Sequence, residues 1–312
     1  MKEKTVNYRL FACPIHKFPL SETLFCSSCA REYPAVNQVP VLINDANSVF
    51  RIEDYISSRG YEGASSYAGH LDQRRGWRQR YRRTVSLLSE ASPPRRDFGV
   101  IDAMTRISAN VPNPRVLVVG AGDSGISGDV VHTDVAFGAN VQCIADAHDL
   151  PFVSQSFDAC FAIAVLEHVA DPYRCVQEIS RVLKPSGYVY AETPFMQPVH
   201  MGAYDFTRFS YLGHRRLFRS FSEVAAGIVG GPGVSAGQML NYAISSLSDR
   251  AAYRRWLKLI GLLLTYPLRS LDRLSYRNLS AYDSASGFYF FGQLSKEPIS
   301  DRELITLFRG GR

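Results

Sequence analysis

Short apolar runs alternate with polar turns between residues 115 and 192. The runs are RVLVV at 115–119, VVHTD at 130–134, VQCIA at 141–145, FDACFAIA at 157–164 and YVYAE at 188–192. Runs of this length, rich in β-branched and apolar residues, predict buried strands. Between the last two, PYRCVQEISRVLKPSG predicts a helix that Pro185 and Gly187 end. Strands that alternate with helices indicate an α/β fold with a mostly parallel sheet.

The pattern changes on both sides of this segment. We expect a compact module at 1–45, a polar, basic and helical connector at 46–110, the α/β domain at 111–297 and a C-terminal tail at 298–312. Within the domain, a helical insertion is expected at about 235–280, before a last strand, GFYFFGQL. We expect this strand to form an antiparallel hairpin with a strand near residues 223–229.

The insertion contains the apolar run WLKLIGLLLTYPL at 256–268, interrupted by Lys258 and Pro267. A membrane-spanning helix needs about 20 apolar residues, so this run is too short to span. It could lie in a membrane interface, form a dimer contact or cover a substrate pocket. Packing within the protein is the favoured interpretation, since buried core helices commonly have this length.

Composition says little about the fold, but it excludes some classes of protein. With 312 residues, of which 46% are hydrophobic and 21% charged, the chain resembles ordinary folded proteins and not disordered or collagen-like ones. The net charge is +6, with arginines crowded into residues 74–96 and a second basic group around 254–277. Such patches favour polyanions or anionic lipid headgroups, although solvated helix faces are the simpler interpretation of each. Because MKEKTVNYRL lacks the apolar region of a secretory signal, we expect a cytoplasmic protein, at most peripheral to the inner face of the membrane through 256–268.

The N-terminal module contains two ligand pairs at knuckle spacing. Cys13 and His16 form one C-x-x-H pair, and Cys26 and Cys29 form a C-x-x-C pair. A tetrahedral zinc ion needs four such donors, and a module this small can bury little apolar surface, so we predict a structural zinc site. The alternative is a ribbon that has lost its metal, with His16 at the surface. The remaining cysteines lie in apolar segments and are expected in the core: Cys143, Cys160 and Cys175.

Glycines follow the first strand of the α/β domain. Gly120, Gly122 and Gly125 satisfy the G-x-G-x-x-G spacing of a dinucleotide site. A dinucleotide fold needs a full helix after the third glycine, but only ISGD separates Gly125 from the next strand, whose end carries Asp134. This short crossover argues against a dehydrogenase or flavoprotein.

The downstream block DAHDLPFVSQSFDACFAIAVLEHVADPYRCVQEISRVLKPSG resembles class I S-adenosylmethionine-dependent methyltransferases of the type 11 kind. The resemblance covers about residues 115–220 and implies a Rossmann-like, doubly wound, seven-stranded sheet. The chain departs from the family pattern in its short first crossover and in Val118, where an acid is common. The N-terminal CPIH…CSSC segment similarly resembles small zinc ribbons found beside bacterial methyltransferases, where CPxC is usual.

The resemblance also implies roles for individual residues. Gly120 and Gly122 would face the methionine part of the cofactor, Asp134 would accept from the ribose hydroxyls, and Asp146 with Ala147 would contact adenine. Further residues would flank the cofactor: His148, Ala162, Ile163, Ala164 and His168. A turn or helix cap is the alternative role for either aspartate.

The segment ETPFMQPVHMGAYDFTRFS follows the fifth strand, where the rim of a doubly wound sheet meets its substrate. We predict Phe195, Tyr204 and Arg208 as substrate residues, His200 as a general base and Asp205 as its orienter or an alternative base. The segment also resembles one in class I methyltransferases of surface-sugar or secondary-metabolite modification. Two alternatives stay open: Asp205 and Arg208 could form a local ion pair, and His200 could make a loop hydrogen bond.

These features together predict an enzyme that methylates a hydroxyl or carboxylate on a small-molecule or glycan-linked acceptor, with S-adenosyl-L-methionine as cofactor and a structural Zn²⁺. One rival is an RNA methyltransferase that holds phosphates with the zinc module and the arginines of 74–96. The other is a non-catalytic scaffold whose zinc ribbon docks a partner.

Overall fold

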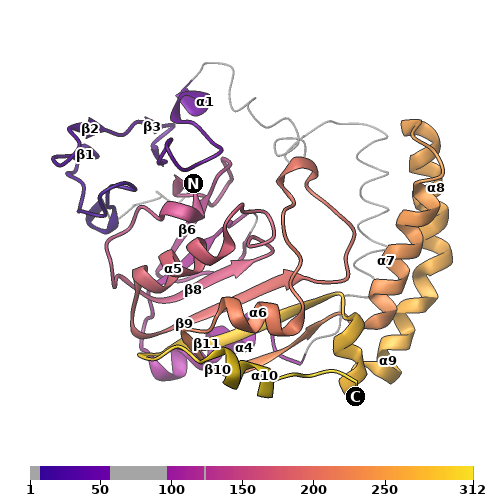
Figure 1. Cartoon of the computed structure of the whole chain (residues 1–312). Helices are drawn as coiled ribbons and strands as arrows, with labels where there is room; N and C mark the ends of the chain where they lie inside the picture. Colours follow the sequence, from indigo (N-terminus) through magenta and orange to yellow (C-terminus); the bar gives the residue numbers. More distant parts are fainter. Residues whose placement is uncertain (1–7, 57–96, 123, 312) are drawn as a thin grey trace.

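A single large sheet forms the centre of the molecule (Figure 1). The computed structural model describes residues 8–56, 97–122 and 124–311, and within these ranges the sheet has nine strands in the order β10-β11-β9-β8-β5-β6-β7-β4-β3. Their bounds are β3 Ala35–Val36, β4 Val39–Leu42, β5 Val116–Val119, β6 Val130–Asp134, β7 Cys143–Ala145, β8 Phe157–Ile163, β9 Leu183–Pro194, β10 Phe221–Val229 and β11 Gly287–Leu294. A separate small ribbon pairs β1 (Phe25–Cys26) with β2 (Arg31–Glu32).

The predicted α/β sheet is confirmed. Strands β5 to β9 run parallel, and all four residues of β5 are buried because both faces of the sheet are covered. Strand β11 lies antiparallel between β9 and β10, so the predicted C-terminal hairpin is present, with Ala226 opposite Phe290.

Two strands beyond the expected seven come from the N-terminal module. Strand β4 pairs parallel with β7, with Val41 opposite Ile144, and β3 pairs antiparallel with β4. Strand β7 would otherwise present an unpaired edge, and the buried Val41 and Leu42 cover it. The module is thus continuous with the central sheet. The expected count of seven strands did not include its two strands.

Helices cover both faces of the sheet. Helix α5 (Pro172–Val182) begins where Asp171 accepts from the amide of Arg174, and it buries Cys175, Val176, Ile179 and Val182 against one face. It ends earlier than predicted, since β9 already begins at Leu183; the helical conformation is disfavoured for a residue before proline, here Lys184. Helix α4 (Val100–Asn110) packs Ala103 and Ile107 on the opposite face.

The insertion forms a helical hairpin beside the sheet (Figure 1). Helix α7 (Pro232–Ser245) packs on α8 (Ala251–Thr265), and the two backbones approach closely because a Cβ at Gly261 would lie 3.2 Å from the Asn241 Cα. Short helices follow: η4 Tyr266–Leu271, α9 Asp272–Ser275, η5 Leu279–Ser284 and, after β11, α10 Asp301–Thr306. We expected the apolar run at 256–268 to pack within the protein, and only one face of α8 does so. Trp256 and Leu264, on the other side, are 68% and 65% exposed. Among the described helices, none is long and apolar enough to cross a membrane.

Candidate cofactor and acceptor site

The turn after β5 depends on Gly120. Its φ of +63° is left-handed, and a Cβ there would lie 2.3 Å from Cγ2 of Val165, in the loop after β8. Glycine is the residue that takes this conformation without strain, so the loops after β5 and β8 can meet. Gly122, with φ +48°, then donates its amide to Oδ2 of Asp134 at 2.9 Å. No helix is present among the described residues between β5 and β6, in agreement with the short crossover.

Two buried carboxylates stand at the carboxyl ends of neighbouring strands. Asp134 ends β6 and accepts from the amides of Gly122 and Ala136. Asp146 follows β7, and its Oδ1 accepts from the amide of His148 and lies 2.6 Å from that ring's Nδ1. Burial raises the pKa of Asp146, but its contacts with His148 outweigh burial and lower it, so the group is ionised. Both aspartates therefore cap local backbone, which was the alternative role. Oδ1 of Asp146 is already engaged twice by His148, so Oδ2, which accepts from Ser48, is the oxygen that can accept a further bond from a ligand.

A cavity of about 100 Å³ lies beside these carboxylates. Its lining includes predicted residues Gly120, Asp134, Asp146, Ala147, His148, Ala164, His168 and Tyr204. Gly122 and Ala162 are not part of this lining, and Ile163 faces a different cavity. Ligand pockets commonly measure about 300–1,000 Å³, so side chains around this cavity must move outward to admit a nucleoside.

Residues that directly follow the N-terminal module supply one wall of this cavity. Asn47, Val49 and Phe50 line it, and Phe50 stacks on Tyr204 with ring centroids 5.7 Å apart. Ser48 Oγ donates to Oδ2 of Asp146 at 2.5 Å. Our sequence interpretation missed these residues, because nothing in a polar stretch that follows the predicted zinc ligands indicates a contact with the segment after β7, about one hundred positions later.

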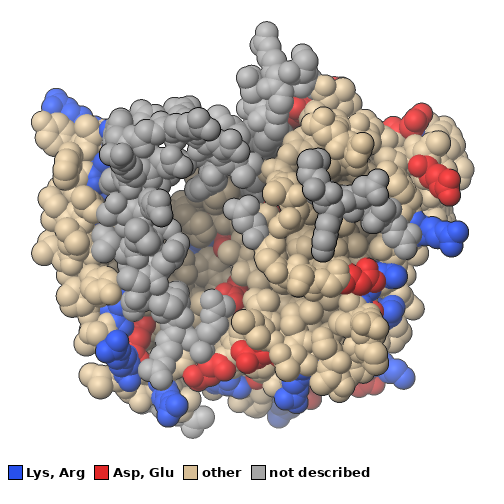
Figure 2. Space-filling view, turned by 180° about the vertical axis from the view of Figure 1, so that it is seen from behind, with Lys and Arg blue, Asp and Glu red and all other residues tan. Residues whose placement is uncertain are grey.

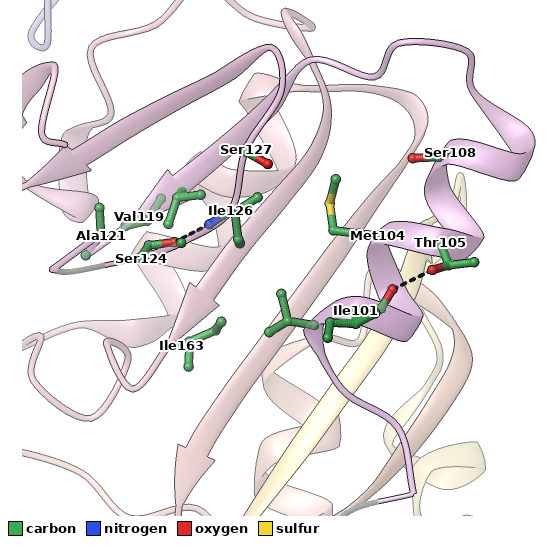
Figure 3. A pocket seen from close by; sticks show the side chains of 14 residues that line it. Ile101, Met104, Thr105, Ser108, Val119, Ala121, Ser124, Ile126, Ser127 and Ile163 are labelled. Carbon is green, nitrogen blue, oxygen red and sulfur yellow. Dashed lines mark hydrogen bonds between the residues drawn. The ribbon is translucent and has the colours of Figure 1, made fainter. Parts of the chain in front are cut away.

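A larger cavity of about 810 Å³ opens near the same turn, toward α4 (Figure 3). Ile101 and Met104 of α4 face it together with Ile126 and Ile163 from the sheet side. No acidic residue lines it among the described residues, so it offers no carboxylate to ribose hydroxyls or an adenine amino group. Despite its size, it suits the cofactor less well than the cavity beside Asp134 and Asp146.

The loop after β9 is organised by an ion pair. Arg208 pairs with both oxygens of Asp205 and donates to the carbonyls of Gln197, Pro198 and Thr207. Asp205 also accepts from the amide of His200 at 2.7 Å. Burial raises the pKa of Asp205, but Arg208 outweighs burial and lowers it. Asp205 and Arg208 thus form the local ion pair that the sequence left open as an alternative, and this pair braces the loop. Asp205 is also placed to orient His200.

The two aromatic residues that we predicted to contact substrate lie in different places. Tyr204 lines the smaller cavity together with Phe206. Phe195 instead stacks on Phe288 at 5.4 Å, in the cluster around Tyr211. Its packing there fixes the start of the loop after β9.

Glu167 is a buried acid that was not among the predicted site residues. It is 1% exposed, and neither carboxylate oxygen has a hydrogen-bond partner among the described residues. Its Oε1 lies 3.6 Å from Nε2 of His168 and 3.8 Å from Nε2 of His200. Burial raises the pKa of Glu167 to about 7, while burial lowers that of His168. The adjacent Glu167 and His168 after β8 could have been noticed in the sequence. Nothing in the sequence indicates that His200 lies near them.

The N-terminal cysteines and histidine converge as predicted from their spacing. The donor atoms of Cys13, His16, Cys26 and Cys29 all lie within 4.8 Å of one another. The Cys13 and Cys29 sulfurs are 3.9 Å apart, and Cys13 Sγ is 3.6 Å from Nδ1 of His16. Donors around a tetrahedral zinc ion are separated by about 3.5–3.8 Å, so the arrangement fits that ion.

Comparisons with known proteins agree with this geometry. Residues 128–191 match the family model described as a methyltransferase domain. The chain carries a methyltransferase domain. It is 40% identical over 74 residues to an uncharacterised methyltransferase of Mycolicibacterium vanbaalenii, a match that covers 23% of this chain and 28% of that protein. It is 31% identical over 140 residues to a demethylmenaquinone methyltransferase of Clavibacter sepedonicus, covering 44% and 49%.

The matches thus span half or less of the length of these curated relatives. Among solved structures, the chain is similar to phosphoethanolamine N-methyltransferase 2 of Haemonchus contortus in complex with S-adenosyl-L-methionine. That likeness has a TM-score of 0.40 at 15% identity and covers 80% of this chain and 61% of the other.

Proposed function

We propose that this methyltransferase domain binds S-adenosyl-L-methionine in the smaller cavity and transfers its methyl group to a small-molecule or glycan-linked hydroxyl or carboxylate. The pairing of Asp134 and Asp146 at adjacent strand ends, beside the Gly120 turn, is the observation that carries the proposal. Asp134 would accept from the ribose hydroxyls and Asp146 from the adenine amino group, with Ala147 and His148 beside the base.

Methyl transfer is an in-line displacement on an already activated sulfonium, so position and exclusion of water can supply most of the acceleration. The cofactor supplies the methyl group. Phe50 and Tyr204 stack on each other in the cavity wall and would keep water from the reacting atoms. His200, oriented by Asp205, has its ring 4.7 Å from that of His168 and would face the acceptor from there.

A compact acceptor suits this site better than RNA. On the face shown in Figure 2, the described Lys and Arg residues are interspersed with Asp and Glu instead of forming one continuous basic surface. The arginines at 74–96, on which the RNA hypothesis depends, lie outside the described residues. An RNA acceptor remains the alternative, and a methyl-transfer assay distinguishes the two.

We also propose that Cys13, His16, Cys26 and Cys29 hold one structural zinc ion. The fit of their donor separations to tetrahedral coordination supports this. Because the set supplies four protein ligands, it leaves no open position for catalysis.

Substitution of Asp134 tests the cofactor site. We expect Asp134→Ala to weaken S-adenosylmethionine binding by about 1.5–3 kcal/mol, through loss of charge-assisted hydrogen bonds, when measured by calorimetry. Asp129→Ala is a matched control, since Asp129 is 55% exposed at the side chain and pairs with Arg115 on the same crossover. NADH and FAD should give no comparable thermal stabilisation. Equal affinity of the two variants, or tighter binding of a dinucleotide, would contradict the assignment.

The acceptor class is tested with labelled cofactor. The protein is incubated with total RNA and, separately, with an extract of glycans and small metabolites. Label in the second fraction is expected, because aromatic and polar side chains around Tyr204 suit a compact ligand. Label confined to a defined RNA nucleotide would favour the RNA methyltransferase.

A further inference from the structure

Glu167 presents an unusual situation for a buried acid. Its side chain is almost fully buried, yet both oxygens lack hydrogen-bond partners among the described residues. A buried polar group without a partner is destabilising, so a carboxylate in this position calls for a ligand. The amides of Phe206 and Thr207 bond the Glu167 carbonyl and hold the loop after β9 against it. Among the described residues, the nitrogens that face Oε1 at ion-pair distance are the Nε2 atoms of His168 and His200, at 3.6 and 3.8 Å.

Both histidines turn the same nitrogen toward this carboxylate. Nδ1 of His168 lies 2.7 Å from the Tyr204 carbonyl, which fixes the proton on Nδ1 and leaves the Nε2 lone pair facing Glu167. Nδ1 of His200 lies 3.4 Å from Oδ2 of Asp205 and 3.4 Å from Nη2 of Arg208, beside the ion pair that these two residues make. A histidine that binds a metal typically donates its other ring N–H to a carbonyl or carboxylate. His168 shows this pattern, and at His200 the carboxylate of Asp205 is the corresponding acceptor beside Nδ1.

We propose that Glu167, His168 and His200 bind one divalent first-row transition-metal ion. Donors around a common ion would be about 3–3.5 Å apart, so the two distances from Glu167 Oε1, 3.6 and 3.8 Å, need to shorten by only a few tenths of an ångström. All three donor atoms lie within 4.8 Å of one another, and rotation of the imidazole rings would bring their nitrogens onto the ion. Two imidazoles and one carboxylate favour Zn²⁺, Mn²⁺, Fe²⁺ or Co²⁺ over Mg²⁺ or Ca²⁺. Three protein ligands leave open coordination positions, which is the arrangement of catalytic and not structural sites.

The ion deepens the proposed function, on which its catalytic role rests. His168 also lines the cofactor cavity, so an acceptor oxygen bound to the ion would lie beside the cofactor. The ion lowers the pKa of a bound hydroxyl, which releases its proton to water. That oxygen then attacks the methyl carbon; the C–O bond forms, the C–S bond breaks, and sulfur keeps the electron pair as a thioether. The preferred acceptor is therefore a hydroxyl with a neighbouring oxygen that can also ligate the ion.

Manganese binding tests the site without an activity assay. The full chain, carrying its N-terminal zinc, is titrated with Mn²⁺ while the electron paramagnetic resonance signal of free Mn²⁺ is recorded. Thiolates prefer zinc, so the cysteine site does not take up Mn²⁺. We expect one Mn²⁺ per chain, displaced by added Zn²⁺. Because loss of an outer partner alone typically costs 10–100-fold in affinity, Glu167→Gln and His200→Gln should each weaken Mn²⁺ binding by about 100-fold or more.

Glu297→Gln is the matched control, since Glu297 is exposed and remote from these residues in the chain. S-adenosylmethionine affinity and thermal unfolding are measured on every variant, to show that each one folds. Absence of Mn²⁺ binding, or equal binding by Glu167→Gln and wild type, would overturn the metal site. A protein that binds Mn²⁺ but not S-adenosylmethionine would instead overturn the proposed function.

Discussion

At the residue scale, Gly120 controls how closely two loops approach. Its left-handed φ and the overlap that a Cβ would have with Val165 act together, whereas Gly122 has the positive φ but open space around it. Gly125 has open space and no left-handed φ. Three glycines that look equivalent in the sequence thus have three different structural requirements.

Alanine substitutions at these glycines should separate the two effects. Gly120→Ala is expected to lower the free energy of unfolding by about 2–4 kcal/mol, since it adds steric overlap to backbone strain. Gly122→Ala should cost about 1–2 kcal/mol from strain alone. Gly125→Ala is the matched control and should change stability by less than about 1 kcal/mol. Urea unfolding measures all three, and equal losses for Gly120→Ala and Gly122→Ala would contradict the assigned overlap.

At the element scale, α6 (Tyr211–Leu217) contributes a titratable group to the core. His214 is 2% exposed and packs edge-on against Phe218, with ring centroids 5.2 Å apart. Burial, with a smaller effect of the neighbouring Arg215, lowers the pKa of His214 to about 3. The ring is therefore neutral in the folded protein at every pH near neutrality.

This helix should make the protein sensitive to acid. An unfolded histidine has a pKa of about 6.5, so between that pH and about 3 the unfolded state binds the additional proton. Stability is complete above about pH 6.5 and falls with decreasing pH, by about 2 kcal/mol between pH 7 and 5. His214→Leu, which keeps the position apolar, should remove this part of the slope in urea unfolding at several pH values. An unchanged slope in that variant would show that other groups cause the acid sensitivity.

At the scale of the whole molecule, the N-terminal module and the residues that follow it, up to α1, join the smaller cavity to the rest of the fold. Lys17 bonds Asp149 and Glu178, and Tyr55, in α1 (Ile52–Ile56), donates to the Val135 carbonyl at 2.7 Å. Strand β4 extends the sheet at β7, and the residues that follow it form a wall of the cavity. Loss of order in the module should therefore reach the cofactor site.

Zinc removal tests this connection. Elemental analysis should find one zinc per chain, reduced in Cys29→Ser. Chelation should lower the thermal midpoint and weaken S-adenosylmethionine binding by about 1 kcal/mol or more, because the Ser48 bond to Asp146 and the Phe50 wall depend on the folded module. Zinc added back should restore both. A zinc content near zero in wild type, or full cofactor affinity after chelation, would contradict the prediction.

Local patterns in the sequence were sufficient for the strands, the C-terminal hairpin and the proximity of the predicted zinc ligands. Burial on both faces makes strands such as VLVV at β5 continuously apolar, and two-residue gaps hold Cys13 near His16 and Cys26 near Cys29 in any fold. The absence of a helix after Gly125 also followed from chain length alone.

Only the tertiary structure decided which distant residues meet. Strand β4 covers the edge of β7, and Ser48 donates to Asp146. Buried sheet edges and buried polar groups must be paired, but the sequence does not indicate which distant segment will pair with them. Likewise, Glu167 and His168 are adjacent in the chain, but His200 joins them only through backbone bonds from Phe206 and Thr207 and the brace of Asp205 and Arg208. Such contacts depend on the packing of the entire loop onto the sheet, and periodicity within either segment carries no information about them.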